Sequence, residues 1–296
     1  MQDFRYALAH SIDEATKLLT QNGDMARVLA GGTDLLVQMR NKSRVVGLVV
    51  DIKQIPEVNE LSFDSQTGLS IGAAVPCLRI CDHPSVATLY PGLVDAISLI
   101  GGSQIQARAT VGGNLANASP AADAIPALIV HEATCDLAGR NGFRQVTVEA
   151  FCVGPGQTIL ENGELLVRLH VNPPVAGFGA HYLRFTPRNE MDIAVVGAAA
   201  SVVLEDDGHV FRSGRIALGA VAPTPILSRD AGDYLAGRSV SREVIEQAAS
   251  LAAESASPIT DVRGTASQRK HLANVLTRRA LERASQRAKE NLNKES

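Results

Sequence analysis

The sequence predicts an α+β protein built in two parts, and three observations support this prediction. Near the N-terminus a strand, a glycine-containing loop, a helix and a second strand follow one another, as in a small α/β subdomain. The dipeptide Pro173-Pro174 then marks a boundary in the chain. Beyond it the pattern changes to three strands joined by turns and followed by two helices. At 296 residues the chain is long enough for two or three domains.

The elements before this boundary are predicted from the spacing of apolar residues. In chain order we expect a helix over 11–22, strands over 26–30 and 45–52 with a short helix over 34–39 between them, a strand–turn–strand unit over 61–74, a helix over 91–100, a polar segment over 104–109, a helix over 121–131, and strands over 134–138, 145–147 and 164–170. Together they form a predicted first domain of residues 1–175, with subdomains of about 1–55 and 56–175.

Residues 176–290 are predicted to form a second, smaller domain. Its strands are expected over 182–186, 193–204 and 214–221, and its helices over 241–255 and from 265 to about 290. Asp206-Asp207-Gly208 is a hairpin turn signal between two of these strands. The last helix carries many Arg and Lys residues opposite its apolar side, and we interpret them as a solvated face.

Composition and charge argue against several classes of protein. A net charge of −3, no Trp and four Tyr give no sign of a nucleic-acid-binding surface. The N-terminus has no basic region followed by an apolar core, so it does not read as a signal peptide. No apolar run approaches the length needed to cross a bilayer. We therefore expect a cytoplasmic protein that binds neither nucleic acid nor membrane.

The four cysteines are scattered and lack a C-x-x-C motif, so we expect free thiols: Cys77, Cys81, Cys135 and Cys152. Cys77 and Cys81 could share one helical face and touch a metal. No other cluster of Cys or His completes a tetrahedral set, however. We expect no metal site on this chain.

Two glycine-containing stretches are the strongest functional signal. The first, residues 28–34, reads Val-Leu-Ala-Gly-Gly-Thr-Asp, and the second begins at Thr110-Val-Gly-Gly-Asn114 and runs to Asp123. Glycine lets a backbone approach a ligand closely, and successive N–H groups in such a turn make a concavity for phosphate. Two such loops, far apart in sequence, suit a ligand with two phosphates and a long body.

Both stretches can also be interpreted as ordinary turns without a ligand. Gly-Gly pairs are common in ordinary turns, and either stretch alone reads more readily as a turn than as a phosphate site. Neither matches G-x-G-x-x-G or G-x-x-x-x-G-K-[ST], the two best-known phosphate fingerprints. Polar residues around both pairs, such as Thr33, Asn114 and Asn117, strengthen the functional reading.

No residue is predicted to be catalytic. The sequence contains neither G-x-S-x-G nor H-E-x-x-H, and His131 is interpreted as a helix cap or core residue. Binding loops without an acid–base pair suit a protein whose cofactor carries the reactivity.

The two motifs together resemble a known signature. Ala30-Gly-Gly-Thr-Asp34 with Thr110-Val-Gly-Gly-Asn114 is similar to the flavin-binding signature of the FAD-binding (medium) subunits of molybdenum hydroxylases, which include xanthine, carbon monoxide and nicotinate dehydrogenases. The resemblance extends over nearly the whole chain. It implies a two-subdomain FAD-binding fold of the vanillyl-alcohol-oxidase (PCMH) type, followed by a smaller α+β C-terminal domain of the CO-dehydrogenase flavoprotein type.

The resemblance also implies which residues hold FAD. The residues implied to surround its pyrophosphate are Val28, Leu29, Ala30, Gly31, Gly32, Thr33, Asp34, Thr110, Gly113 and Asn114. Those implied for the rest of the cofactor are Asn117 and Asp123 at the ribityl and ribose portions, Ile100 over the isoalloxazine ring, Leu166 or Val167 near the adenine, and Arg184 in place of a lysine near the flavin. A fixed cation at position 184 would favour the anionic reduced flavin.

One departure from the family concerns the approach to the second motif. The family often has Gln-Ile-Arg-Asn there, whereas this chain has Gln104-Ile-Gln-Ala107, with Arg108 one step further on. A specific arginine contact at this place is therefore in doubt, but the glycine motif itself is not.

The function implied by the resemblance is electron transfer within a complex. The chain would take electrons from iron–sulfur clusters onto FAD and pass them to an external acceptor. Its partners would be a large molybdopterin subunit and a small subunit with two two-iron two-sulfur clusters, as a heterotrimer or its dimer. The alternatives are a stand-alone flavin reductase or oxidase of the same fold, and a non-catalytic nucleotide-binding module.

Overall fold

The N-terminal part of the chain is a small parallel sheet of three strands in the order β1-β3-β2. The computed structural model describes residues 3–188 and 191–295. The elements of this N-terminal unit are β1 (Arg5–Leu8), α1 (Ile12–Asn22), a 3₁₀ turn (Gly23–Met25), β2 (Ala26–Leu29), α2 (Leu35–Arg40) and β3 (Leu48–Asp51). The two predicted helices and the two predicted strands of this unit are confirmed. Strand β1 was not predicted, because its four mostly exposed residues carry no clear apolar alternation.

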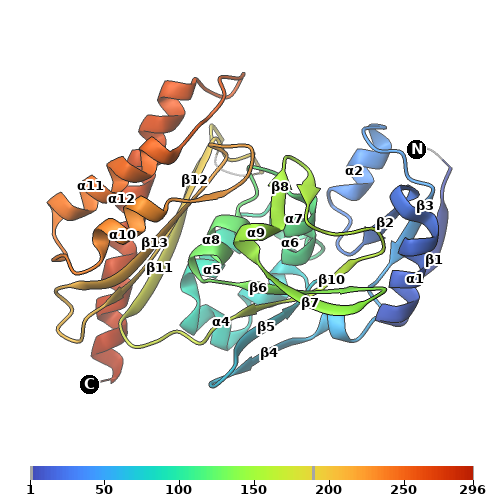
Figure 1. Cartoon of the computed structure of the whole chain (residues 1–296), viewed down its shortest axis with the longest axis horizontal. Helices are drawn as coiled ribbons and strands as arrows, with labels where there is room; N and C mark the ends of the chain where they lie inside the picture. Colours follow the sequence, from blue (N-terminus) through green and yellow to red (C-terminus); the bar gives the residue numbers. More distant parts are fainter. Residues whose placement is uncertain (1–2, 189–190, 296) are drawn as a thin grey trace.

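A five-stranded antiparallel sheet forms the middle of the molecule, in the order β4-β5-β10-β6-β7 (Figure 1). Its strands are β4 (Leu61–Asp64), β5 (Gly68–Gly72), β6 (Thr134–Gly139), β7 (Gly142–Thr147) and β10 (Leu165–Val171). The helices and short elements around it are a 3₁₀ turn (Glu57–Asn59), α3 (Cys77–Cys81), α4 (Pro84–Leu89), α5 (Pro91–Ile97), α6 (Ser103–Gln106), α7 (Val111–Asn117), α8 (Ala124–Val130), α9 (Val148–Phe151) and the hairpin β8 (Cys152–Gly154)–β9 (Gln157–Thr158).

Two expectations in this part are corrected. The second glycine stretch is not a loop but the start of helix α7, and the polar segment before it contains the short helix α6. Thr110 caps α7, because its Oγ1 accepts a hydrogen bond of 2.9 Å from the Gly113 N–H. A Cβ at Gly112 would lie 2.5 Å from the Ala73 carbonyl oxygen, so the absent side chain lets the helix pack directly on the backbone at the end of β5.

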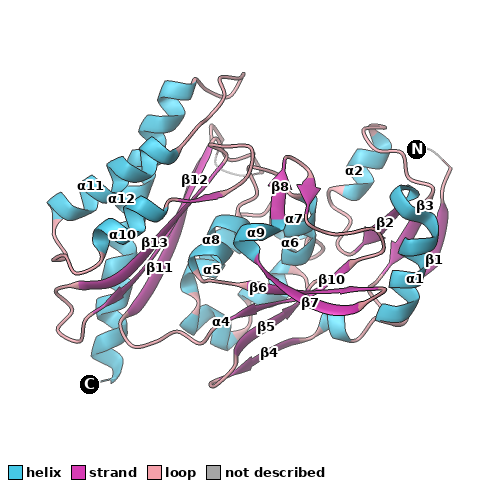
Figure 2. Cartoon of the chain, in the orientation of Figure 1, coloured by secondary structure: helices cyan, strands magenta, loops and turns pink. Residues whose placement is uncertain are grey.

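The C-terminal part is a four-stranded antiparallel sheet in the order β11-β12-β13-β14, with helices on one face (Figure 2). Its elements are β11 (Phe178–Phe185), β12 (Val196–Leu204), β13 (Phe211–Gly219), β14 (Ile226–Leu227), α10 (Arg229–Leu235), α11 (Arg242–Ser255) and α12 (Ala266–Glu295). The other face packs on α5 and α8 of the middle part. The predicted strands and helices are confirmed, whereas α10 and β14 were not predicted.

A partly buried network of side chains connects the C-terminal helix to the middle of the molecule. Arg287 of α12 donates to both carboxylate oxygens of Asp95 on α5, and His181 of β11 contacts the same carboxylate. No helix in the described part of the chain is long and apolar enough to cross a membrane.

Candidate functional site

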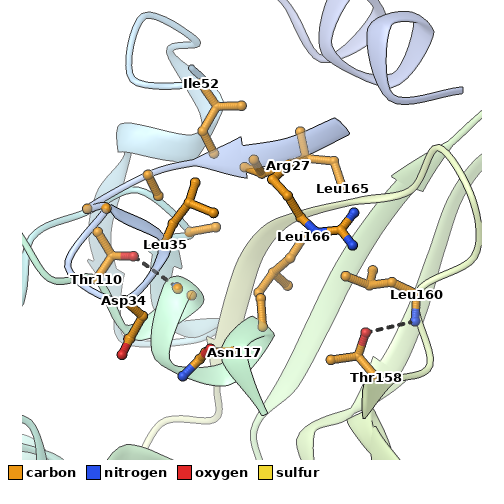
Figure 3. Close-up of a pocket in the computed structure, with 18 of the residues that line it drawn as sticks. Arg27, Asp34, Leu35, Ile52, Thr110, Asn117, Thr158, Leu160, Leu165 and Leu166 are labelled. Atoms are coloured by element: carbon orange, nitrogen blue, oxygen red, sulfur yellow. Dashed lines mark hydrogen bonds between the residues drawn. The ribbon is translucent and has the colours of Figure 1, made fainter. Parts of the chain in front are cut away.

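A cavity of about 370 Å³ lies between the N-terminal unit and the middle part, and both glycine motifs line it (Figure 3). The predicted site residues that line this cavity are Val28, Ala30, Gly31, Gly32, Thr33, Asp34, Ile100, Thr110, Gly113, Asn114, Asn117 and Leu166. Segments some 80 residues apart in sequence thus meet at one site.

The first motif offers a row of unused backbone donors. The N–H groups of residues 31–34 donate no hydrogen bond to any atom in the described part of the chain. Gly32 has a φ of +80°, which is a left-handed conformation that favours glycine. A Cβ at Gly31 would lie 2.1 Å from the Arg108 carbonyl oxygen. The turn therefore packs tightly against the segment before the second motif and leaves consecutive N–H groups available for an anion.

The second motif contributes an unpaired side chain and open space. The Asn114 side-chain oxygen is buried and has no hydrogen-bond partner among the described residues. A Cβ at Gly113 would meet only the Thr110 Oγ1, at 2.9 Å, so the space beyond it is the cavity. A buried acceptor without a donor is costly, and a hydroxyl group of a ligand would satisfy it.

Two hydrogen bonds cross from the α2 region to the middle part. The Gln38 side-chain amide donates to the Asn117 side-chain oxygen at 2.9 Å, which connects α2 to α7. Arg44 makes a longer contact, 3.4 Å, from Nη2 to the Gly156 carbonyl oxygen in the β8–β9 hairpin. All four residues line the cavity, so these contacts lie at its boundary.

The end of the cavity away from the glycine motifs has both apolar and polar residues in its wall. It is lined by leucines at positions 160, 165 and 166, and the Arg27 side chain reaches into it (Figure 3). Residues of the cavity wall that sequence reasoning missed include Arg27, Gln38, Arg44, Thr158, Leu160 and Leu165. They come from five separate segments, and only Arg27 adjoins a motif that the sequence singled out.

Four predicted site residues do not line the cavity. Two of them pack in apolar cores instead: Leu29 packs with Met39, and Val167 lies in the core of the N-terminal unit while Leu166 lines the cavity. The other two, Asp123 and Arg184, are paired with each other.

The Asp123 carboxylate sits in a buried network that connects α8 to β11. It accepts from the Tyr182 hydroxyl at 2.7 Å and from the Arg184 guanidinium at 2.6 Å, and the side chains of Asp123 and Arg184 are 10% and 7% exposed. Burial raises the pKa of the Tyr182 phenol well above its usual value, so it remains a donor. The charge of Arg184 is thus matched by a carboxylate within the protein.

His131 is a core residue at the end of α8. Its Nδ1 donates to the Ala127 carbonyl oxygen at 2.7 Å, and its ring lies between those of Tyr90 and Phe178. Burial lowers its pKa to about 4, so it is neutral at pH 7. Among the described residues no group of three or more His, Cys, Asp or Glu is arranged to hold a metal ion.

Comparisons with known proteins agree with this architecture. Residues 2–174 match the model of the FAD binding domain in molybdopterin dehydrogenase, and residues 181–284 match that of the CO dehydrogenase flavoprotein C-terminal domain. The chain is 30% identical over 286 residues to the xanthine dehydrogenase FAD-binding subunit of Escherichia coli O157:H7, covering 96% of this chain and 97% of that one. It is 33% identical to the carbon monoxide dehydrogenase medium chain of Hydrogenophaga pseudoflava, covering 95% and 96%.

Solved structures show the same similarity. Carbon monoxide dehydrogenase from Hydrogenophaga pseudoflava matches with a TM-score of 0.92 at 32% identity, covering 96% of this chain and 97% of that one. Quinoline 2-oxidoreductase from Pseudomonas putida 86 matches with a TM-score of 0.89 at 31% identity, covering 97% and 98%.

The fold and the paired glycine motifs define an FAD-binding oxidoreductase component with a two-subdomain FAD-binding fold and an α+β C-terminal domain. More narrowly, the chain belongs to the family of FAD-binding subunits of molybdenum hydroxylases of the xanthine and carbon monoxide dehydrogenase type. The family and the fold expected from the sequence are confirmed.

Proposed function

We propose that FAD binds in the cavity with its pyrophosphate on the free N–H groups of residues 31–34. The observation that carries this proposal is the row of unused donors on residues 31–34, which line the same cavity as Gly113. Thr110 holds the first turn of α7 in place through its hydrogen bond to Gly113. The unpaired oxygen of Asn114 is suited to a ribityl or ribose hydroxyl, and Ile100 to one edge of the flavin ring.

The remaining predicted residues differ in which of their atoms a cofactor could reach. Asn117 is held by Gln38 through its oxygen, so its amide N–H groups are the part available to a ligand. Leu166 supports the adenine proposal better than Val167, because only Leu166 faces the cavity. Asp123 and Arg184 form an ion pair with each other and do not line the cavity, so they would affect the cofactor only indirectly.

We further propose that the chain is the electron-transfer subunit of a multi-subunit enzyme. Bound FAD supplies the capacity to accept and release electrons, and the protein supplies binding, orientation and shielding from water. Electrons would come from iron–sulfur clusters on a small subunit, with molybdopterin on a large one, and would leave to an external acceptor. The relatives named as a subunit or as a medium chain support this arrangement. The proposed domains are residues 1–175 and 176–290, and the complex would be a heterotrimer or its dimer.

The test is affinity purification of the tagged chain from its native source. We expect yellow protein with FAD absorbance, and we expect two further chains that carry iron and molybdenum. The chain expressed alone should bind FAD but show no flavin bleaching with heterocycles or aldehydes under anaerobic conditions. A chain that purifies alone, without metal, and reduces its flavin directly with a small substrate would instead be a stand-alone flavoenzyme. A chain that purifies colourless and does not bind added FAD would refute both.

A further inference from the structure

A second cavity, of about 180 Å³, lies between the middle part and the C-terminal part of the chain. Its wall is formed by the end of α8, the linker that follows β10, and strands β11, β12 and β13. Among the described residues, none lines both this cavity and the one between the two glycine motifs. The second cavity is therefore a separate space, and a ligand in it would contact both parts of the molecule.

The wall of this cavity contains a buried acceptor without a donor. His131 lines the cavity and is 5% exposed. Its Nδ1 donates to the Ala127 carbonyl oxygen at 2.7 Å, so the other ring nitrogen, Nε2, carries a lone pair. Nε2 is buried and has no hydrogen-bond partner among the described residues. An unpaired acceptor of this kind is costly, and an O–H group of a ligand would satisfy it.

The charge on the same wall is already matched within the protein. Arg215 lies 3.2 Å from the carboxylate of Glu132 and 3.8 Å from that of Glu149. Its Nε is buried without a hydrogen-bond partner among the described residues, so the wall offers a donor as well as an acceptor. Because the guanidinium already has carboxylate partners, a neutral polar group suits this wall better than an ion does. A hydroxyl group is neutral and can both donate and accept.

The size and the surface of the cavity match a single ring. An apolar cavity of about 150 Å³ is large enough to bind benzene. The His131 ring lies between those of Tyr90 and Phe178, with centroids 6.3 and 5.4 Å away, and all three residues line the cavity. Pro173 and Pro174 of the linker add apolar surface. A further aromatic ring would pack favourably in such surroundings.

One side of the cavity lies at the protein surface. Asn172, Val175 and Ser213 line it and are exposed, whereas Val130 and Ser201 line it and are buried. A small molecule could therefore enter past the exposed residues without separating the two parts of the chain.

We propose that this second cavity binds a small neutral ring compound with a hydroxyl group, of about the size of phenol. The hydroxyl group would donate to Nε2 of His131, and the ring would pack against Tyr90 and Phe178. This inference goes beyond the proposed function and does not depend on flavin binding.

The experiment is a calorimetric titration of the purified protein with phenol, benzene and benzoate. Phenol should bind saturably and about fivefold more tightly than benzene, because it adds one hydrogen bond to a buried acceptor. Benzoate should bind more weakly than phenol, because its charge has no free partner on this wall. His131→Phe keeps an aromatic ring but removes Nε2, so it should bind phenol and benzene equally.

A second variant tests the position of the ligand without changing the buried residues. Val175→Trp places a large side chain at the exposed side of the cavity and should weaken phenol by about tenfold. Val153→Trp is the matched control, because Val153 is 60% exposed, close to the 55% of Val175, and lines neither cavity. It should bind phenol as the unaltered protein does. Thermal melting of every variant checks that it is folded.

Several outcomes would overturn this inference. Without saturable phenol binding, the cavity holds water only. Equal affinities for phenol and benzene in the unaltered protein would refute the role of the hydroxyl group, and unchanged phenol binding in Val175→Trp would place the ring elsewhere. Flavin-loaded and flavin-free protein should bind phenol equally, so a loss of phenol binding on addition of FAD would place phenol in the first cavity. Failure of the protein to bind FAD would refute the proposed function and leave this site untouched.

Discussion

Substituting Gly113 by valine should abolish FAD binding while leaving the fold almost intact. The Cβ would meet only the Thr110 Oγ1, at 2.9 Å, and the two methyl groups would extend into the cavity beside residues 31–34. Loss of the Thr110 cap costs about 1 kcal/mol, and replacing a helical glycine by an ordinary residue returns roughly 0.5 kcal/mol. The free energy of unfolding should therefore change by less than about 1 kcal/mol.

The effect on binding should be much larger. Two methyl groups in the space proposed for the pyrophosphate should weaken FAD by at least about a hundredfold, which corresponds to roughly 3 kcal/mol. The assay combines flavin occupancy of the purified protein, titration of flavin-free protein with FAD, and urea unfolding of both proteins without flavin. Gly113→Ala should lie between the two, because it adds the Cβ alone. Near-normal flavin occupancy in Gly113→Val with an unchanged urea midpoint would remove this motif from the site.

Four further predictions follow from other contacts. Gly31→Ala should lower stability even without flavin, because its Cβ would lie 2.1 Å from the Arg108 carbonyl oxygen; an unchanged urea midpoint would contradict this. Asp123→Asn should destabilise the protein by about 3 kcal/mol, because it leaves the buried Arg184 side chain without a counter-charge. Adding Arg184→Met should recover part of this loss, and equal urea midpoints for the single and double variants would argue against the pair. The pKa of His131 falls from an ordinary 6.5 to about 4 on folding, so the folded state binds this proton more weakly than the unfolded state does. Lowering the pH from 6.5 to 4 should therefore reduce the free energy of unfolding by about 3 kcal/mol through this residue. In urea unfolding across this range, His131→Phe should lose about 3 kcal/mol less than the unaltered protein, and parallel curves for the two proteins would refute the assignment. Acid precipitation should release all FAD to the supernatant, since none of the described residues that line the cavity is a His, Cys or Tyr that could form a covalent flavin bond, and yellow colour retained in the pellet would refute this.

Much of the fold follows from local patterns in the sequence. Helix α1 has clear amphipathic spacing and a Ser11 cap that accepts from the Glu14 N–H, and β3 is entirely buried, with three apolar residues before Asp51. Helix α7 was missed because Gly112 and Gly113 favour turns, whereas the Thr110 cap and close contact with the Ala73 backbone support a helix there. Tertiary packing decided the structure of this segment against its own propensity.

The candidate site was predictable in its centre and not at its edges. The two motifs identify the pyrophosphate region because backbone approach requires glycine. The choice between Leu166 and Val167 depends on which of the two side chains lines the cavity and which packs in the core, and the sequence alone does not fix this because both are apolar. Arg27 and Arg44 could not be predicted because a single arginine forms no sequence pattern, and only the folded structure places both on the wall of one cavity.

The paired glycines look equivalent in the sequence but serve different purposes in the structure. Gly31 and Gly112 are required by protein packing, since added side chains would collide with the backbone at Arg108 and Ala73. Gly32 supplies a left-handed turn, and a Cβ added at Gly113 would meet a side-chain atom of Thr110 and no backbone atom of another segment. Because Gly31 packs on the residue two positions before Thr110, the first motif is positioned by direct contact with the approach to the second. A substitution that loosens this contact should therefore weaken FAD binding at both motifs together, even where the residues proposed to touch the cofactor are unchanged.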